Sequence, residues 1–280
     1  MQAKVYVTNY PAGDFRAMPA LGDGHALLKW VTSFPGNPGR GLPTVTGLVL
    51  LSDANDGRLL AILDAATVTA LRTAAAAVLA ADTLARPNAE SFAVIGAGAN
   101  GAETARMFAA RGREVLVSDV DAKRAHAVAA EVGGHVTTSA EEALGCDVVA
   151  TVTPGARVLY APGSLRAGQH ISLMGADARG KAEVAIEELR RARLFCDEWE
   201  QASHDGELAG AVAAGAVTRE DVTELGEVLS EQAVGRASDD DITLFDSTGL
   251  AIQDLAIVKL AYSKRNELNL QTIELEAGAT

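Results

Sequence analysis

Apolar runs of strand length alternate with helical patterns through the middle of the chain. Residues 92–95 and 114–118 are two such runs, and between them alanines and a phenylalanine recur three or four residues apart along one helix face. The same alternation continues to residue 245, which predicts an α/β domain built on a doubly wound parallel sheet. The later elements that the pattern predicts are helices at 122–132, 139–144 and 183–191 and strands at 135–137, 147–151, 170–174, 194–196 and 242–245.

The two ends of the chain have a different pattern. Strands are predicted at 4–8, which alternates and is rich in β-branched residues, and at 15–18, 27–32, 47–52 and 59–63, and the Gly- and Pro-rich residues 34–43 predict a loop. An alanine-rich helix is predicted at 65–84, and a helix at 250–262 is expected to pack back on these strands. We therefore expect a second, α+β domain made of residues 1–87 and 250–280, beside the doubly wound domain of residues 88–249.

Three glycines follow the strand at 92–95 with GxGxxG spacing. They are Gly96, Gly98 and Gly101, with Ala99 and Asn100 between them, and a helix follows directly. In the dinucleotide-binding (Rossmann) fingerprint, such glycines permit a tight turn, close approach of backbone to the pyrophosphate, and close packing of helix on strand. The free N–H groups of the helix then face the phosphates. Alone, the three glycines would indicate only a tight turn, but the flanking strands and helix favour nucleotide binding.

Asp119 ends the second strand of this unit, eighteen residues after Gly101. A carboxylate at this place accepts hydrogen bonds from the adenosine ribose hydroxyls. It also repels a 2′-phosphate. The sequence therefore predicts NAD as the cofactor.

Composition and charge exclude several classes of partner. The 280 residues carry a net charge of −13, which argues against nucleic acid or an anionic membrane, because a phosphate surface needs a basic face. No apolar run of membrane-spanning length and no signal peptide is recognised, so we expect a cytoplasmic protein with a small-molecule substrate. Cys146 and Cys196 form no metal-binding pattern and are expected to be buried thiols, and the five histidines show no ligand spacing, so no metal is predicted.

A carboxylate also follows the strand at 170–174. Asp177 lies between Gly175 and Gly180, beyond the carboxyl end of that strand, where ligands of doubly wound sheets bind. It could act as a general base or position a water. The alternative is that Asp177 caps the segment that begins near Lys181.

Four cations come from the otherwise apolar first domain: Lys4, Arg16, Lys29 and Arg72. Lys29, in the middle of a predicted strand, is either solvent-facing or directed into a site. Arg72, among alanines, is either a surface arginine or a buried guanidinium that needs an anion. If several converge, a small carboxylate fits between them, since opposite charges about 4 Å apart gain about 4 kcal/mol at an effective dielectric near 20. Each cation singly is more often a surface charge.

The turn at Ser247 could be interpreted as a nucleophile turn. However, no histidine is placed to pair with Ser247. A Ser/Thr cap to the helix that starts at Leu250 explains the turn better.

These stretches resemble the ornithine cyclodeaminase/mu-crystallin family, and more closely its archaeal-type alanine dehydrogenase branch. The matching segments are KVY at Lys4, GDFRAMPA at Gly13, KWV at Lys29, FPGNPGRGLPTV, TALRTAAA around Arg72, IGAGANG, GADARGK around Asp177 and FDSTGLAIQD at Phe245. The resemblance implies a homodimer in which the first and last segments form a substrate and dimerisation domain. It also implies that Lys29 and Arg72 hold a substrate carboxylate, that Lys4 and Arg16 line the site, and that Asp177 takes part in proton or water chemistry.

Two departures from the family pattern accompany the resemblance. Members usually carry a helical segment ahead of the first strand, whereas Lys4 stands almost at the start here. The cyclodeaminase branch carries a glutamate in place of Arg16. A glutamate would suit a substrate with a second amine, and an arginine would repel it.

The leading functional hypothesis is an NAD-dependent oxidoreductase acting on a small α-amino or imino acid such as alanine, with Asp177 and Lys29 as catalytic residues. A cyclic imino acid reductase would use the same site in reverse. The first alternative is ornithine cyclodeaminase, an ammonia lyase that uses NAD with no net redox change. The second alternative is a non-catalytic, mu-crystallin-like binding protein, against which the presence of all the candidate site residues argues.

Overall fold

The computed structural model describes residues 4–9, 12–154, 157–176 and 180–273. The chain divides into two compact units. One is made of Met1–Val68 with Ala251–Thr280, and the other of Thr69–Leu250.

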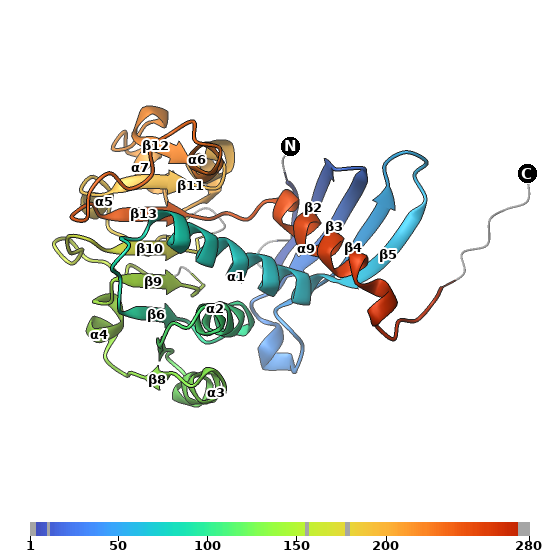
Figure 1. The fold of residues 1–280 in the computed structure, drawn as a ribbon, viewed down its shortest axis with the longest axis horizontal. Helices are drawn as coiled ribbons and strands as arrows, with labels where there is room; N and C mark the ends of the chain where they lie inside the picture. Colours follow the sequence, from blue (N-terminus) through green and yellow to red (C-terminus); the bar gives the residue numbers. More distant parts are fainter. Residues whose placement is uncertain (1–3, 10–11, 155–156, 177–179, 274–280) are drawn as a thin grey trace, which may run out of the picture. The chain divides into compact units, whose positions relative to one another are not determined.

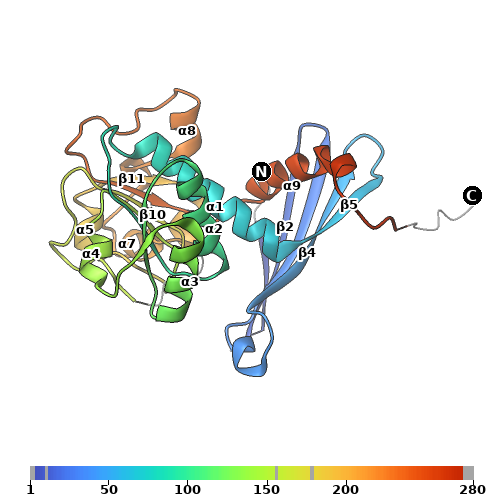
Figure 2. The same cartoon turned by 60° about the horizontal axis from the view of Figure 1, so that its bottom comes forward.

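The first unit is an antiparallel sheet with a helix on one face (Figures 1 and 2). Its strands, in order across the sheet, are β1 (Val5–Asn9), β2 (Gly13–Gly22), β3 (His25–Ser33), β4 (Val45–Asp53) and β5 (Leu59–Asp64). Side chains alternate between the faces, so that Leu27 and Val31 of β3 are buried and pack with Leu255 and Val258 of helix α9 (Ala251–Ser263). The prediction that the last helix returns to these strands is confirmed.

A short 3₁₀ helix, η1 (Asn37–Arg40), interrupts the segment that was expected to be a loop. Pro38 lies in its first turn, where the missing N–H costs nothing and the fixed φ suits a helix, and Gly41 ends it with a φ of 72°. The Gly and Pro content therefore limits the helix to one turn rather than preventing it. A second short 3₁₀ helix, η3 (Arg265–Glu267), follows α9.

The second unit is an eight-stranded parallel sheet with helices on both faces (Figures 1 and 2). The strands are β6 (Phe92–Ile95), β7 (Val115–Ser118), β8 (His135–Val136), β9 (Val148–Thr151), β10 (His170–Leu173), β11 (Arg193–Cys196), β12 (Val222–Glu224) and β13 (Thr243–Asp246), in the order β12-β11-β13-β10-β9-β6-β7-β8. The helices are α1 (Ala65–Leu84), α2 (Ala99–Ala110), α3 (Ala122–Val132), α4 (Ala140–Leu144), α5 (Ile186–Leu189), α6 (Trp199–Asp205), α7 (Ala209–Ala213) and α8 (Leu225–Leu229), with η2 (Arg219–Asp221) before β12.

Successive residues of the central strand β6 face opposite layers of this unit. Phe92 and Val94 pack with residues of α1, α2 and α3, whereas Ala93 packs with the cluster that contains Leu189 and Ala211. The chain turns back at β6, with β7 on one side and β9 on the other. The predicted doubly wound sheet is confirmed, and its switch point lies between β6 and β9.

Helix α1 lies mostly in the second unit, which differs from the expected boundary after residue 87. From Thr69 onward it belongs to that unit, where Ala77 and Leu84 are fully buried in the cluster that also holds Val94 and Phe245. By length and composition α1 could also cross a membrane, which the sequence reading did not recognise. More than half of it is buried within the fold, as in the core helix of a globular protein.

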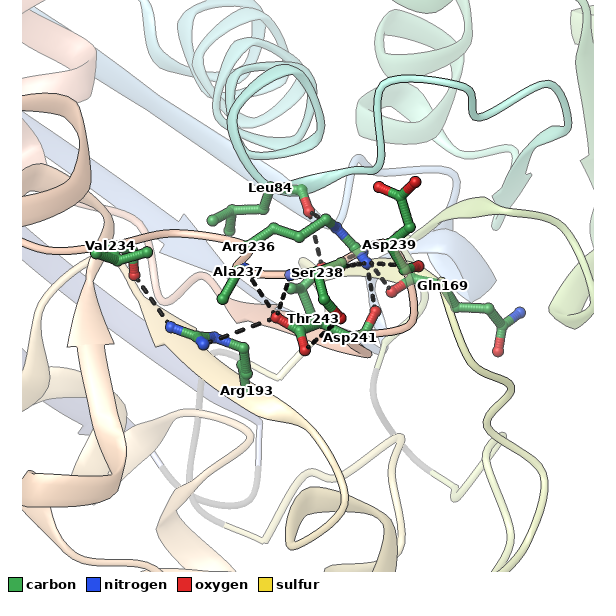
Figure 3. Close-up of polar contacts among 10 residues, drawn as sticks. All are labelled: Leu84, Gln169, Arg193, Val234, Arg236, Ala237, Ser238, Asp239, Asp241 and Thr243. Carbon is green, nitrogen blue, oxygen red and sulfur yellow. Dashed lines mark hydrogen bonds and ion pairs between the residues drawn. The ribbon is translucent and has the colours of Figure 1, made fainter.

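Arg236 links the end of α1 to the edge of the sheet where β10 and β13 begin (Figure 3). Its guanidinium donates to the carbonyls of Leu84 (2.7 Å) and Gln169 (3.0 Å), to the carbonyl of Asp241, and to the hydroxyl of Thr243 (3.0 Å). Burial lowers the pKa of Arg236 from its ordinary value. This edge, where the parallel strands start, is therefore occupied by structural contacts.

Candidate active site

The glycine turn lies at the opposite edge of the sheet, where β6 ends. Gly96 has a φ of 102°, and a Cβ there would lie 2.6 Å from the carbonyl oxygen of Val152, so only glycine fits. A Cβ on Gly101 would lie 1.7 Å from the carbonyl oxygen of Gly96. Around Gly98, which precedes α2, no described atom would lie within 4 Å of a Cβ. The turn is therefore tightly packed on its inner side and open where a diphosphate would approach.

Ala99 and Asn100 form the start of α2, directly behind Gly98. Because Gly98 has no side chain to cap α2, the first N–H groups of the helix are not covered by a capping side chain. Such N–H groups bind phosphate in dinucleotide-binding turns. The residues of this turn thus fit the pyrophosphate of NAD.

Asp119 follows β7 and connects three parts of this edge. Its Oδ2 accepts from the N–H of Ala97 (2.6 Å), and its Oδ1 accepts from the N–H of Asp121 (2.7 Å) and from Nη2 of Arg124 (2.9 Å). Burial raises the pKa of Asp119, but these donors outweigh burial and leave the pKa below its ordinary value. The carboxylate is therefore ionised at neutral pH, and it is held against the glycine turn.

Replacing Asp119 by serine is expected to raise KM for NAD by about tenfold and to shift the ratio of kcat/KM values toward NADP, because an Arg beside this position accommodates a 2′-phosphate. Arg124, which pairs with Asp119, is that basic neighbour. Steady-state kinetics with both cofactors measure the shift. Asp121→Ser is the matched control, because Asp121 also lies beside Arg124 (3.6 Å) and serine keeps the cap of α3. An unchanged cofactor preference in Asp119→Ser would show that the acid does not contact the ribose.

Glu183 supports the strand ends next to the glycine turn. Its buried carboxylate accepts from the hydroxyl of Thr151 (2.5 Å) at the end of β9 and from the hydroxyl of Thr153. A Cβ on Gly175 would lie 3.1 Å from Oε1 of Glu183. Burial raises the pKa of Glu183. Glu183 therefore holds the end of β9 and the segment that follows it, and it packs against Gly175 after β10, in the segment that leads to Asp177, which lies outside the described residues.

Two further carboxyl groups, those of Glu207 and Asp246, are buried in this part of the second unit. Glu207 accepts from the N–H groups of Glu183 (2.8 Å) and Val184 (2.7 Å), and burial raises its pKa to about 7. Asp246, at the end of β13, accepts from the N–H of Leu208 (3.1 Å), and burial, with the charges of Asp197 and Glu207, raises its pKa well above the ordinary value. These acids are structural acceptors that bind the 183–208 segment to the sheet.

Arg72 of α1 lies against the turn that follows β13. A Cβ on Gly249 would lie 2.4 Å from Nη1 of Arg72 and 2.8 Å from its Cζ, so the guanidinium packs directly on the backbone of this residue. Gly249 has a φ of 79°, the left-handed region that favours glycine. Arg72 is half-buried, between the two interpretations of a surface arginine and a buried guanidinium. Its guanidinium lies at the edge where β13 ends, as expected for a residue that contacts a ligand of such a sheet.

The other candidate cations belong to the first unit. Lys29 on β3 is 1% exposed, and its ammonium lies 2.9 Å from Oδ1 of Asp254, which is fully buried. Arg16 on β2 makes two hydrogen bonds to Asp14 (2.6 and 3.2 Å), and its Cζ lies 5.3 Å from the ring centre of Tyr6. The register places Arg16 opposite Val31, two residues from Lys29. Arg16 and Lys29 thus point to the same face of the sheet.

Lys4 lies just before β1 and is half-buried. The structure therefore groups two of the four cations, Arg16 and Lys29, on one sheet face, and it places Arg72 in the other unit. Substrate contact by any of the four remains a prediction.

Sequence reasoning missed the residues that hold this edge together, namely Asp197, Glu183 and Glu207. One signal could have found the first: Asp197 directly follows the strand that ends at Cys196, just as Asp119 follows β7. Glu183 begins the predicted helix at 183–191, and Glu207 lies where no element was predicted, so in neither case did the local pattern indicate the burial that the fold creates. Cys146 and Cys196 are buried, as predicted.

A sequence profile of the ornithine cyclodeaminase/mu-crystallin family matches residues 1–269. An alanine dehydrogenase from Archaeoglobus fulgidus is 42% identical over 278 residues, which cover 96% of this chain and 86% of that protein. An ornithine cyclodeaminase from Agrobacterium tumefaciens is 32% identical over 270 residues, with 93% and 74% covered.

Two solved structures have the same fold. An archaeal alanine dehydrogenase dimer with bound NAD matches with a TM-score of 0.91 at 41% identity, over 99% of this chain and 88% of that one. The Δ(1)-pyrroline-2-carboxylate reductase of Thermococcus litoralis, in complex with NADH and L-proline, matches with a TM-score of 0.88 at 29% identity, over 95% and 87%. The similarity therefore extends over both units and includes proteins whose structures contain a nicotinamide dinucleotide.

Proposed function

Because the chain belongs to the ornithine cyclodeaminase/mu-crystallin family, we propose that it is an NAD-dependent oxidoreductase of a small α-amino acid, with L-alanine as the first substrate to test. NAD as the cofactor is supported by the glycine turn, which leaves space at Gly98 and holds the carboxylate of Asp119 beside it. Alanine is supported by the 42% identity to the alanine dehydrogenase of Archaeoglobus fulgidus.

When bound, NAD would supply the acceptor for the hydride on Cα of the substrate, and oxidation at Cα would give an imine. Water then adds to the imine carbon, and ammonia leaves to give the α-keto acid. We assign Lys29 and Arg72 to the substrate carboxylate, Lys4 and Arg16 to the lining of the site, and Asp177 to proton transfer with the attacking water. The reverse direction would reduce an imine, as in the pyrroline-2-carboxylate reductases among the relatives.

Arg16 distinguishes the leading function from ornithine cyclodeaminase. Its guanidinium is 12% exposed and already engages the carboxylate of Asp14, just as Lys29 on the same sheet face engages Asp254. A second ammonium group of a substrate would have to compete with these two cations for their carboxylates, whereas the glutamate that the cyclodeaminase branch carries in place of Arg16 would attract it. We therefore expect alanine to be preferred over ornithine.

Activity assays on the purified protein distinguish the three candidate functions. Absorbance of NADH that rises with L-alanine and NAD supports the dehydrogenase. Release of proline and ammonia from ornithine without net NADH would instead assign the cyclodeaminase reaction. Absence of turnover with every amino, keto or imino acid tried would favour a binding protein.

We further propose that the protein is a cytoplasmic homodimer whose interface is the outer face of the five-stranded sheet, opposite α9. The strand register forms two rows on this face, Val5-Ala17-Trp30-Leu48 and Pro19-Leu28-Leu50-Ile62. Trp30 and Leu48 are 44% and 53% exposed. A contiguous apolar face of this kind marks an interaction surface. A second copy is the chosen occupant because the archaeal alanine dehydrogenase structure is a dimer.

Trp30→Glu is expected to convert the dimer to a monomer, because it places a charge at the centre of that face. Sedimentation velocity at several protein concentrations measures the change in mass. Leu229→Glu is the matched control, because Leu229 is similarly exposed (49%) but lies on α8 of the second unit. A Trp30→Glu protein that stays dimeric would place the interface elsewhere.

A further inference from the structure

Asp197 anchors the turn that follows β13. Its Oδ1 accepts from the N–H of Glu198 (2.9 Å) and the hydroxyl of Thr248 (3.0 Å). Its Oδ2 accepts from the N–H of Gly249 (2.7 Å) and the hydroxyl of Ser247 (3.2 Å). One carboxylate therefore joins the end of β11 to three consecutive residues of the turn after β13, about 50 residues along the chain.

The same turn forms the surface on which Arg72 lies. The guanidinium is so close to Gly249 that a Cβ there would be 2.4 Å from Nη1 and 2.8 Å from Nη2. Because Oδ2 of Asp197 holds the N–H of Gly249, a shift of this turn would move the surface that contacts Arg72. Asp197, Gly249 and Arg72 all belong to the second unit, so this relation lies within one compact body.

We propose that Asp197 is a positioning residue, which sets the place of the Arg72 guanidinium through the Ser247–Gly249 turn and thereby controls how tightly the substrate carboxylate is bound. This inference rests on the proposed role of Arg72 in binding that carboxylate. Asp197 itself contacts neither substrate nor cofactor in this scheme.

An amide cannot replace this carboxylate, although it has the same shape. Each oxygen of Asp197 faces one backbone N–H, of Glu198 on one side and Gly249 on the other. An asparagine has one oxygen and one NH₂ group, so in either orientation its NH₂ faces a backbone donor. The hydroxyls of Ser247 and Thr248 could rotate to accept, but the two N–H groups could not. Asp197→Asn therefore loosens the turn without removing volume.

In the full-length protein with NAD, Asp197→Asn is expected to raise KM for L-alanine by about 10- to 100-fold, the range for hydrogen bonds to a charged group, with a much smaller change in kcat. The dissociation constant of NAD, measured by fluorescence titration, should change by less than about twofold. The glycine turn follows β6, whereas Asp197 acts at the ends of β11 and β13. Asp197→Glu keeps the charge but changes the length of the side chain, so its KM for L-alanine should lie between those of the original protein and Asp197→Asn.

The matched control is Asp241→Ala at the other edge of the sheet (Figure 3). Asp241 also anchors a turn, since its Oδ2 accepts from the N–H groups of Ala237 (2.8 Å) and Ser238 (3.1 Å). It precedes β13, whereas Asp197 lies where β13 ends. Asp241→Ala removes the acceptor of both N–H groups, so it should lower the melting temperature without changing KM for alanine, which separates loss of stability from loss of position.

A double-mutant cycle with Arg72→Lys completes the test. If Asp197 acts through Arg72, the double variant should have the same KM as Arg72→Lys alone, because the guanidinium that the turn positions is already absent. Independent effects that multiply, or an unchanged KM in Asp197→Asn, would overturn the inference. An unchanged KM in Arg72→Lys would instead overturn the proposed role of Arg72, so the two failures are distinguishable.

Thr248→Val provides a milder variant in case Asp197→Asn does not fold. It removes one hydroxyl donor to Asp197 and leaves both backbone bonds in place. A rise of KM by about threefold would support the inference, since one hydroxyl donor to the carboxylate is lost while the two backbone donors still hold it. An unchanged KM in folded Thr248→Val would count against it.

Discussion

Lys29→Met is expected to lower the free energy of unfolding by about 3–5 kcal/mol, the cost of breaking one side of a buried ion pair. The ammonium of Lys29 lies 2.9 Å from Asp254, and both side chains are essentially inaccessible to water. Methionine fills a similar volume but leaves the carboxylate buried without this cation. Urea denaturation followed by circular dichroism measures the change.

Two controls locate the cause of that loss. Lys29→Met combined with Asp254→Leu should recover most of the stability, because an apolar pair can replace a buried ion pair at little cost. Lys259→Met should cost about 1 kcal/mol or less, since Lys259 pairs with Asp23, which is 84% exposed. A double variant as unstable as the single one would mean that the ion pair is not responsible. Recovered stability without recovered turnover would separate a role of Lys29 in substrate binding from its role in the fold.

Asp177→Asn is expected to lower kcat by about 10²- to 10⁴-fold, the usual contribution of a positioned general acid or base. The affinity for NAD should be unchanged, because the diphosphate is assigned to the turn at Gly98. Single-turnover kinetics of NADH formation measure the effect. The control is Asp240→Asn, which should keep full activity because Asp240 is exposed and lies before β13. Unchanged turnover in Asp177→Asn would remove this residue from the mechanism and favour its alternative role as a helix cap.

Three of the parallel strands in the second unit end on, or are followed by, an aspartate that accepts hydrogen bonds. Asp119 follows β7, Asp197 follows β11, and Asp246 ends β13. Each accepts hydrogen bonds from backbone N–H groups of a neighbouring segment. The strand ends are thus held together by acids, and the site that we propose depends on these contacts as much as on the residues assigned to the ligands.

Local patterns predicted the fold well because they depend on neighbours in sequence. The helices at 65–84 and 122–132 and the strand at 92–95 were predicted with the boundaries that the structure shows. In contrast, the helix expected at 183–191 is reduced to α5, since residues 183 and 184 instead donate their N–H groups to Glu207. Helices α6, α7 and α8, of seven, five and five residues, were not predicted.

The sequence by itself determined the doubly wound sheet and the glycine turn. The hydrophobic period of a strand or helix, and the close packing that requires glycine at Gly96 and Gly101, both depend on residues that are near one another in the chain. Only the tertiary structure decided which charges are paired. Lys29 meets Asp254 across 225 positions of the chain, and Asp197 meets the turn at Gly249 across 52. A hydrogen bond depends on distances of about 3 Å, which folding creates between residues that no periodicity relates.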